Sequence, residues 1–75
     1  MTTLADLTPG QAALVAEVLG EDSISVRIME MGIIDGEEVV LIGRAPMGDP
    51  IEVEVRGYRL SLRSAEARRV SVQVQ

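Results

Sequence analysis

Residues 27–36, R-I-M-E-M-G-I-I-D-G, decide how the first half of this chain folds. Gly32 stands where a helix ends by entering the left-handed conformation that glycine adopts most easily. Asp35 and Gly36 form a turn dipeptide shortly before residues 39–42, V-V-L-I, which favour a strand. The segment therefore predicts a helix that ends before Gly32, a short turn and then a strand.

The residues just upstream fit two periods. Ile24, Val26 and Ile28 alternate as in a strand, whereas Ile24, Ile28 and Met31 would share one face of a helix. We expect a helix, because the glycine that follows is typical of a helix end.

The pattern of the N-terminal part fits either a helix or a strand. Residues 11–19 contain alanines that permit a helix, but a Pro-Gly turn before them and Gly20 after them bound a run of strand length. Leu4 and Leu7 form an apolar pair ahead of that turn. We expect this pair to plug one end of the core.

A hairpin is predicted in the C-terminal half. Ile51, Val53 and Val55 alternate with charged residues, and Leu60 and Leu62 alternate with polar ones. We expect Val53, Val55, Leu60 and Leu62 to be buried on one shared face. The residues expected to be exposed are Glu52, Glu54 and Arg63.

The turn of this hairpin has two possible positions. If Gly57 and Tyr58 form it, glycine takes the first central position of a type II′ turn and Val55 faces Leu60. If Arg56 and Gly57 form it, arginine must adopt a positive φ, which residues other than glycine seldom do. We expect the Gly57-Tyr58 turn.

The remaining elements complete a barrel. Residues 64–69 predict a short turn of helix, and Val70, Val72 and Val74 alternate as a last strand. About five short strands with one aliphatic face each are expected to curl into a closed or nearly closed barrel, which removes the sheet edges. We therefore expect a mostly β fold in one domain over residues 1–75, with one short helix and a short C-terminal helical turn.

Composition limits the classes of function. The chain has 75 residues, 47% of them apolar, and its single aromatic residue is Tyr58. A domain of this size has a small core and little room for an enzyme pocket. The longest apolar run, residues 12–16, is far shorter than the roughly 20 residues that cross a bilayer, and no secretory signal follows Met1. We expect a soluble protein.

The charge argues against nucleic acid as a partner. The net charge is −5, with seven arginines, no lysine and twelve acidic residues, whereas binding to phosphate backbones depends on cationic surface. A local patch of arginines that binds an anion is the less favoured alternative to ion pairing on the surface. We expect pairing of Arg59, Arg63, Arg68 and Arg69 with Glu52, Glu54 and Glu66.

The chain has no histidine and no cysteine. The commonest general base and the best ligands for zinc or ferrous iron are therefore missing. Asp49, Glu52 and Glu54 offer at most a weak site for a hard cation, and Met29 and Met31 are two residues apart and do not share a helix face. We expect no catalytic residue, no cofactor and no metal ligand.

Further segments give a resemblance to a known family. Together with P-M-G-D-P-I at residues 46–51, G-Y-R-L-S-L-R at 57–63 and Glu66-Ala67, the opening segment resembles the FeoA family over nearly the whole chain. Met31 stands where many members have leucine. The resemblance implies an SH3-like five-stranded barrel with a strand at residues 11–19, and it also favours the helix before Gly32. The residues that carry it are Arg27, Glu30, Gly32, Gly36, Pro46, Gly48, Pro50, Gly57, Leu62 and Arg63.

The resemblance also implies a function. It indicates a small cytoplasmic accessory protein of bacterial ferrous-iron uptake, which acts on a ferrous iron permease, a membrane protein with a cytoplasmic GTPase domain. A similar domain occurs in iron-dependent repressors, so the alternative is a free-standing regulatory domain that binds such a repressor. Self-association is a further possibility. Proline-rich ligands are disfavoured, because they need an aromatic-lined groove and the chain has one tyrosine.

Large apolar or aromatic residues on turns are natural contact anchors. On this basis we expect one partner-binding rim formed by Ile33, Ile34, Met47 and Tyr58. The alternative for Ile33 and Ile34 is that they cover the end of the core.

Overall fold

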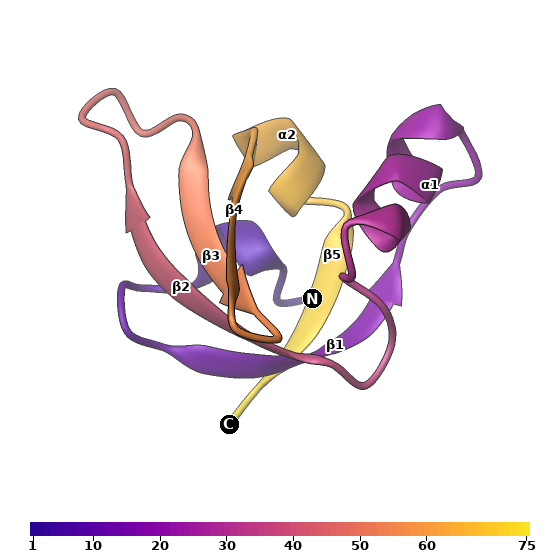
Figure 1. Ribbon diagram of the computed structural model, residues 1–75, viewed down its shortest axis with the longest axis horizontal. Coiled ribbons are helices and arrows are strands. Elements are labelled where there is room, and N and C mark those ends of the chain that lie inside the picture. The colour runs from indigo at the N-terminus through magenta and orange to yellow at the C-terminus, as the bar shows by residue number, and fades with distance from the viewer.

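The computed structural model describes residues 1–75, and Figure 1 shows a strongly curled sheet with short helices at its rims. Its strands are β1 (Ala12–Val18), β2 (Glu38–Arg44), β3 (Ile51–Val55), β4 (Tyr58–Leu62) and β5 (Val70–Val74). Its helices are the 3-10 turn η1 (Leu4–Asp6), α1 (Ser23–Glu30) and α2 (Ser64–Ala67). The predicted mostly β fold is confirmed. None of the helices is long and apolar enough to cross a membrane.

The five strands form one antiparallel sheet in the order β4-β3-β2-β1-β5. The register shifts between Val15 and Glu17 in β1 and between Leu41 and Gly43 in β2. Such bulges bend a strand and increase its twist, which lets the sheet wrap around its core (Figure 1). β4 and β5 do not pair with each other, so the barrel is nearly closed, and α2 connects these two edge strands.

Helix α1 resolves the two periods of its sequence. The side chain of Asp22 caps its start, with Oδ1 accepting a hydrogen bond from the backbone N of Ser25 at 3.2 Å. Past its end, Gly32 has a φ of +102°, the predicted left-handed position. The helix directs Ile28 fully into the core and leaves Ile24 37% exposed. Val26, which a strand would have placed on the same face as Ile28, is 47% exposed.

The core consists of aliphatic side chains inside the curl of the sheet. Leu4 and Leu7 are fully buried, which confirms that they plug one end. Arg44 holds this segment, because its guanidinium donates hydrogen bonds to the backbone oxygens of Leu7, at 3.1 Å, and of Ala5. The other core residues are Ala13, Val15, Ile28, Ile33, Val39, Leu41, Ile51, Val53, Val55, Leu62, Ala67, Val70 and Val72.

The faces of the hairpin differ from the prediction at three residues. Leu60 is only partly buried, and Glu52 and Glu54 are half-buried instead of exposed. β3 lies between two strands, so neighbouring side chains cover its outer face, whereas β4 is an edge strand and is covered from one side only. The residues that lie as predicted are Val53, Val55, Leu62 and Arg63.

The predicted Gly57-Tyr58 turn is wrong. Arg56 and Gly57 form the turn, with φ values of 55° and 83°, and Val55 pairs with Tyr58. Positive φ at both central residues defines a type I′ turn, whose twist matches that of a hairpin. The shift also gives Tyr58 a strand position, which aromatic residues favour.

We expect the change Arg56→Asn to stabilise the protein by about 1 kcal/mol. The left-handed conformation costs most L residues about 1–2 kcal/mol, and asparagine tolerates it better. Urea unfolding measures the difference. The control is Arg56→Gln, which keeps the strain and removes the 3.9 Å contact between Arg56 Nε and Glu37 Oε1. Equal destabilisation by both changes would contradict the prediction and show that the contact with Glu37 outweighs the strain.

Candidate functional site

The four residues predicted to bind a partner differ in accessibility. Ile33 is fully buried, so it covers the end of the core and is not a contact residue. Ile34 is 41% exposed, Tyr58 74% and Met47 91%. Three of the four therefore remain accessible anchors.

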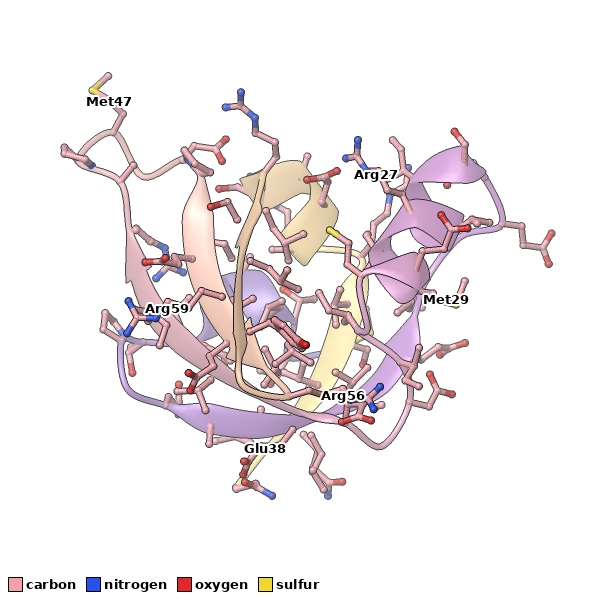
Figure 2. The ribbon with its side chains drawn as sticks, viewed as in Figure 1. Arg27, Met29, Glu38, Met47, Arg56 and Arg59 are labelled. Atoms are coloured by element: carbon pink, nitrogen blue, oxygen red, sulfur yellow. The ribbon has the colours of Figure 1, made fainter.

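These three residues do not form one rim. Met47 lies in the loop between β2 and β3, and Tyr58 follows the turn at the other end of β3. A strand of five residues separates these ends by roughly 17 Å, and Figure 2 shows Met47 at the opposite end of the molecule from Arg56. The turn that carries Ile34 lies beside the hairpin tip, because Arg56 contacts Glu37. The accessible residues of the predicted rim thus lie in two separate places on the molecule.

The Met47 loop is fixed to the start of α2. The backbone N of Ser64 donates to Asp49 Oδ1 at 2.9 Å, and Ser64 Oγ donates to the backbone oxygen of Gly48 at 3.3 Å. The backbone N of Gly48 also donates to the oxygen of Ala45 at 2.7 Å. The loop therefore presents the side chain of Met47 on an ordered tip.

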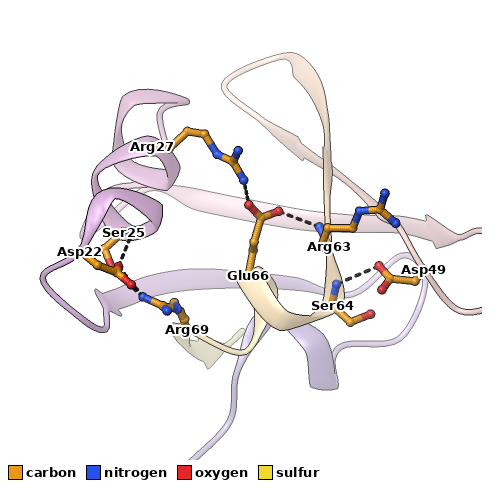
Figure 3. Close-up of polar contacts among 8 residues, drawn as sticks. All are labelled: Asp22, Ser25, Arg27, Asp49, Arg63, Ser64, Glu66 and Arg69. Atoms are coloured by element: carbon orange, nitrogen blue, oxygen red, sulfur yellow. Dashed lines mark hydrogen bonds and ion pairs between the residues drawn. The ribbon is translucent and has the colours of Figure 1, made fainter.

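A groove between α1, α2 and the end of β4 is lined by Arg27, Met31, Ser61, Arg63 and Glu66. Glu66 is 8% exposed and forms an ion pair with Arg27. Its Oε1 also accepts a hydrogen bond from the backbone N of Arg63 at 2.8 Å, as Figure 3 shows. This one carboxylate joins both helices and the end of β4.

The predicted pairing of surface arginines is therefore wrong in its partners. Glu66 pairs with Arg27, which lies 39 positions away and carries no local signal of the contact. Arg59, Arg63 and Arg68 form no ion pair, and Arg69 pairs with Asp22. Tertiary packing of α2 against α1 decides these pairs.

The second polar cluster lies at the start of α1. Arg69 Nη1 is 2.6 Å from Asp22 Oδ1 and 3.2 Å from Ser25 Oγ. The hydrogen bond from Arg69, followed by that from the backbone of Ser25, lowers the pKa of Asp22 to about 2. Gly20 lies against this cluster, where an added Cβ would be 2.8 Å from both Arg69 Nη1 and Ser25 Oγ. The cluster is a structural tie between the end of α2 and the cap of α1.

The structure holds no group of three or more His, Cys, Asp or Glu side chains placed to share a metal ion. Asp49 already accepts the hydrogen bond from Ser64. Met31 packs against the core, whereas Met29 points away from it on α1 (Figure 2). The absence of a metal ligand stays a prediction, tested below.

The family model for the FeoA domain matches residues 2–74. This chain belongs to the FeoA family. An FeoA-like protein from Clostridium acetobutylicum is 40% identical, and the match covers 99% of this chain and 90% of that one with a TM-score of 0.89. FeoA of Stenotrophomonas maltophilia was solved in complex with zinc and is described as a prokaryotic SH3 domain protein. It is 36% identical with a TM-score of 0.86, and the match covers 97% of this chain and 91% of that one.

A further relative joins this domain to another protein. An Fe(2+) transport protein A/Fe(2+) transporter FeoB fusion protein from Porphyromonas gingivalis is 31% identical over 71 residues. Those residues are 95% of this chain and 8% of the fusion protein, so the chain spans only a small part of that relative. The resemblance to FeoA and the SH3-like fold predicted from the sequence are confirmed.

The Asp22–Arg69 pair makes stability depend on pH. Because folding lowers the pKa of Asp22 from 3.8 to about 2, its charged form stabilises the fold above about pH 4, and this contribution is lost as the pH falls through 2. We expect the stability difference between wild type and Asp22→Asn to shrink between pH 4 and pH 2. Asparagine still caps the helix, so urea melts across this range measure the contribution of the Asp22 charge to the free energy of unfolding. A difference that stays constant would contradict the assignment.

We expect no tight site for ferrous iron in this FeoA chain. Carboxylates and thioethers without imidazole or thiolate seldom form a selective site for such metals. Anaerobic calorimetric titration of metal-free protein with ferrous iron tests this, with zinc as a second titrant. Sub-micromolar affinity at whole-number stoichiometry would contradict the prediction, and loss of that binding in Glu52→Gln or Glu54→Gln would locate the site.

Proposed function

We propose that this chain is a cytoplasmic accessory protein of bacterial ferrous-iron uptake, which acts as a protein-interaction module. Its partner is a ferrous iron permease with a cytoplasmic GTPase domain. The chain belongs to the FeoA family, and its match over residues 2–74 supports a role shared with that family.

The observation that carries this proposal is the fusion protein of Porphyromonas gingivalis. There, a region 31% identical to this chain shares one polypeptide with a ferrous-iron transporter. A tether raises the effective concentration of two partners to about millimolar, so two fused domains can associate even when their affinity for each other is weak. A free-standing chain needs a contact surface of its own for the same partner.

The chemistry of the chain favours binding over catalysis. The chain has neither histidine nor cysteine, so its serines have no histidine to activate them. Interaction modules rely instead on exposed anchor residues. The accessible candidates are Met47 at one end of β3, and Tyr58 with Ile34 at the other.

We expect one of two single changes, Met47→Ser or Tyr58→Ser, to weaken association with the permease. Truncation of a contact anchor commonly costs more than about 1 kcal/mol, or roughly fivefold in affinity. Co-purification with the permease and iron uptake, in cells that lack the native copy, measure the effect. The two residues are changed separately, because they lie at opposite ends of the molecule.

The matched control is Met29→Ser, which removes a 40% exposed methionine from the outer side of α1. Each variant must keep the wild-type melting midpoint. Normal association and uptake in both test variants would exclude these two contact points. Co-purification of the wild-type chain with an iron-dependent repressor, and not with the permease, would support the alternative function.

A further inference from the structure

The four methionines of this chain differ in how far solvent reaches them. Met31 packs against the core, and Met29 is 40% exposed on α1. Met47 is 91% exposed, and Figure 2 shows its side chain at the outer tip of the loop between β2 and β3. Met1, at the start of the chain, is 85% exposed. Met47 is therefore the most exposed methionine, and it lies within an ordered loop.

The hydrogen bonds that order this loop do not involve Met47. The backbone N of Gly48 donates to the oxygen of Ala45 at 2.7 Å, and the backbone N of Ala45 donates to the oxygen of Pro50 at 3.0 Å. Ser64 Oγ donates to the oxygen of Gly48 at 3.3 Å. The side chain of Met47 is also outside the hydrophobic core. A chemical change at its sulfur therefore leaves the packing and the hydrogen bonds of the fold in place.

The thioether of methionine reacts with peroxides. A lone pair of the sulfur attacks one oxygen of hydrogen peroxide, the O–O bond breaks and an S–O bond forms. The sulfur loses two electrons, and the departing hydroxide takes the proton of the transferred hydroxyl and leaves as water. Because the oxidant must touch the sulfur, the rate at each methionine depends on its exposure.

Methionine is the one sulfur-containing residue type in this protein. The chain has no cysteine, so no thiolate competes for the oxidant. Exposure then decides which side chain reacts first. By that criterion Met47 precedes both methionines of the α1 region.

We propose that Met47 is a modification site, which a peroxide oxidises to methionine sulfoxide while the fold stays intact. The product replaces a flexible apolar side chain by a polar one at the tip of the loop. Methionine sulfoxide reductases reverse the change with two electrons from thiols, which become a disulfide while the oxygen leaves as water. This inference goes beyond the iron-uptake role, because it concerns the chemistry of one side chain and holds for any partner.

The test is oxidation of the folded full-length protein by hydrogen peroxide, with peptide mapping by mass spectrometry over time. We expect Met47 to react at least about twofold faster than Met29, in line with their exposed fractions of 91% and 40%, and Met31 to react most slowly. Met1 is read separately on the N-terminal peptide. In concentrated urea the three internal methionines should react at similar rates, because unfolding exposes all of them.

A matched pair of variants separates oxidation of Met47 from that of the other methionines. Met47→Leu keeps an apolar side chain without the sulfur, and Met29→Leu makes the same change on α1. After equal treatment, the melting midpoints of wild type and Met47→Leu should agree within about 3 °C, the range of surface substitutions in a domain of this size. Oxidised Met29→Leu should still carry the sulfoxide at position 47. A methionine sulfoxide reductase with a dithiol should then remove that oxygen.

Several outcomes would overturn the proposal. These are reaction of Met29 or Met31 as fast as Met47 in the folded protein, the same order of rates in urea, a larger fall of the melting midpoint in oxidised wild type than in oxidised Met47→Leu, or a sulfoxide that the reductase does not reduce. The mapping contains no permease, so its failure leaves the iron-uptake role unaffected, and failure of that role leaves this site unaffected.

Discussion

The gap between β4 and β5 is the constraint on which the rest of this structure depends. Five short strands curl around the core without closing it, so the two edge strands are held by α2, which connects them, and not by a shared ladder. Glu66 of α2 ties this corner together, because it pairs with Arg27 of α1 and accepts from the backbone of Arg63. A nearly buried carboxylate is tolerable only when such partners satisfy it.

Polar contacts at the rims complement a core that is small and mostly aliphatic. Arg44 donates a hydrogen bond to the backbone just after η1 and so holds η1 over one end of the core. Arg69 donates to Asp22, the residue that caps α1. Asp49 anchors the Met47 loop to α2. Aliphatic side chains fill most of the interior, and the fully buried hydroxyl of Ser25 donates to the backbone oxygen of Leu19 at 2.7 Å. The other hydrogen-bonding side chains lie mainly at the rims, where they orient the helices and loops.

The exposed apolar and aromatic side chains are divided between two ends of the molecule. Met47 stands at one end of β3 and Tyr58 at the other, and β4, which pairs with β3 alone, lies between them along one side of the barrel. Arg59 of this strand forms no ion pair, while the remaining arginines are mostly engaged in holding the fold.

The sequence by itself determined the helix end at Gly32, the C-terminal strands and the aliphatic core, because these follow from glycine conformations and from local apolar periods. The family resemblance, and not the local pattern, decided for a strand over residues 11–19. The sequence also determined the family. Only the tertiary structure decided the Arg56-Gly57 turn, the burial of Ile33 and the pairing of Glu66 with Arg27. It likewise placed Met47 and Tyr58 at opposite ends of β3 and left one edge of β4 unpaired. Each of these depends on which segments meet across the curled sheet, and local periodicity does not specify contacts between distant segments.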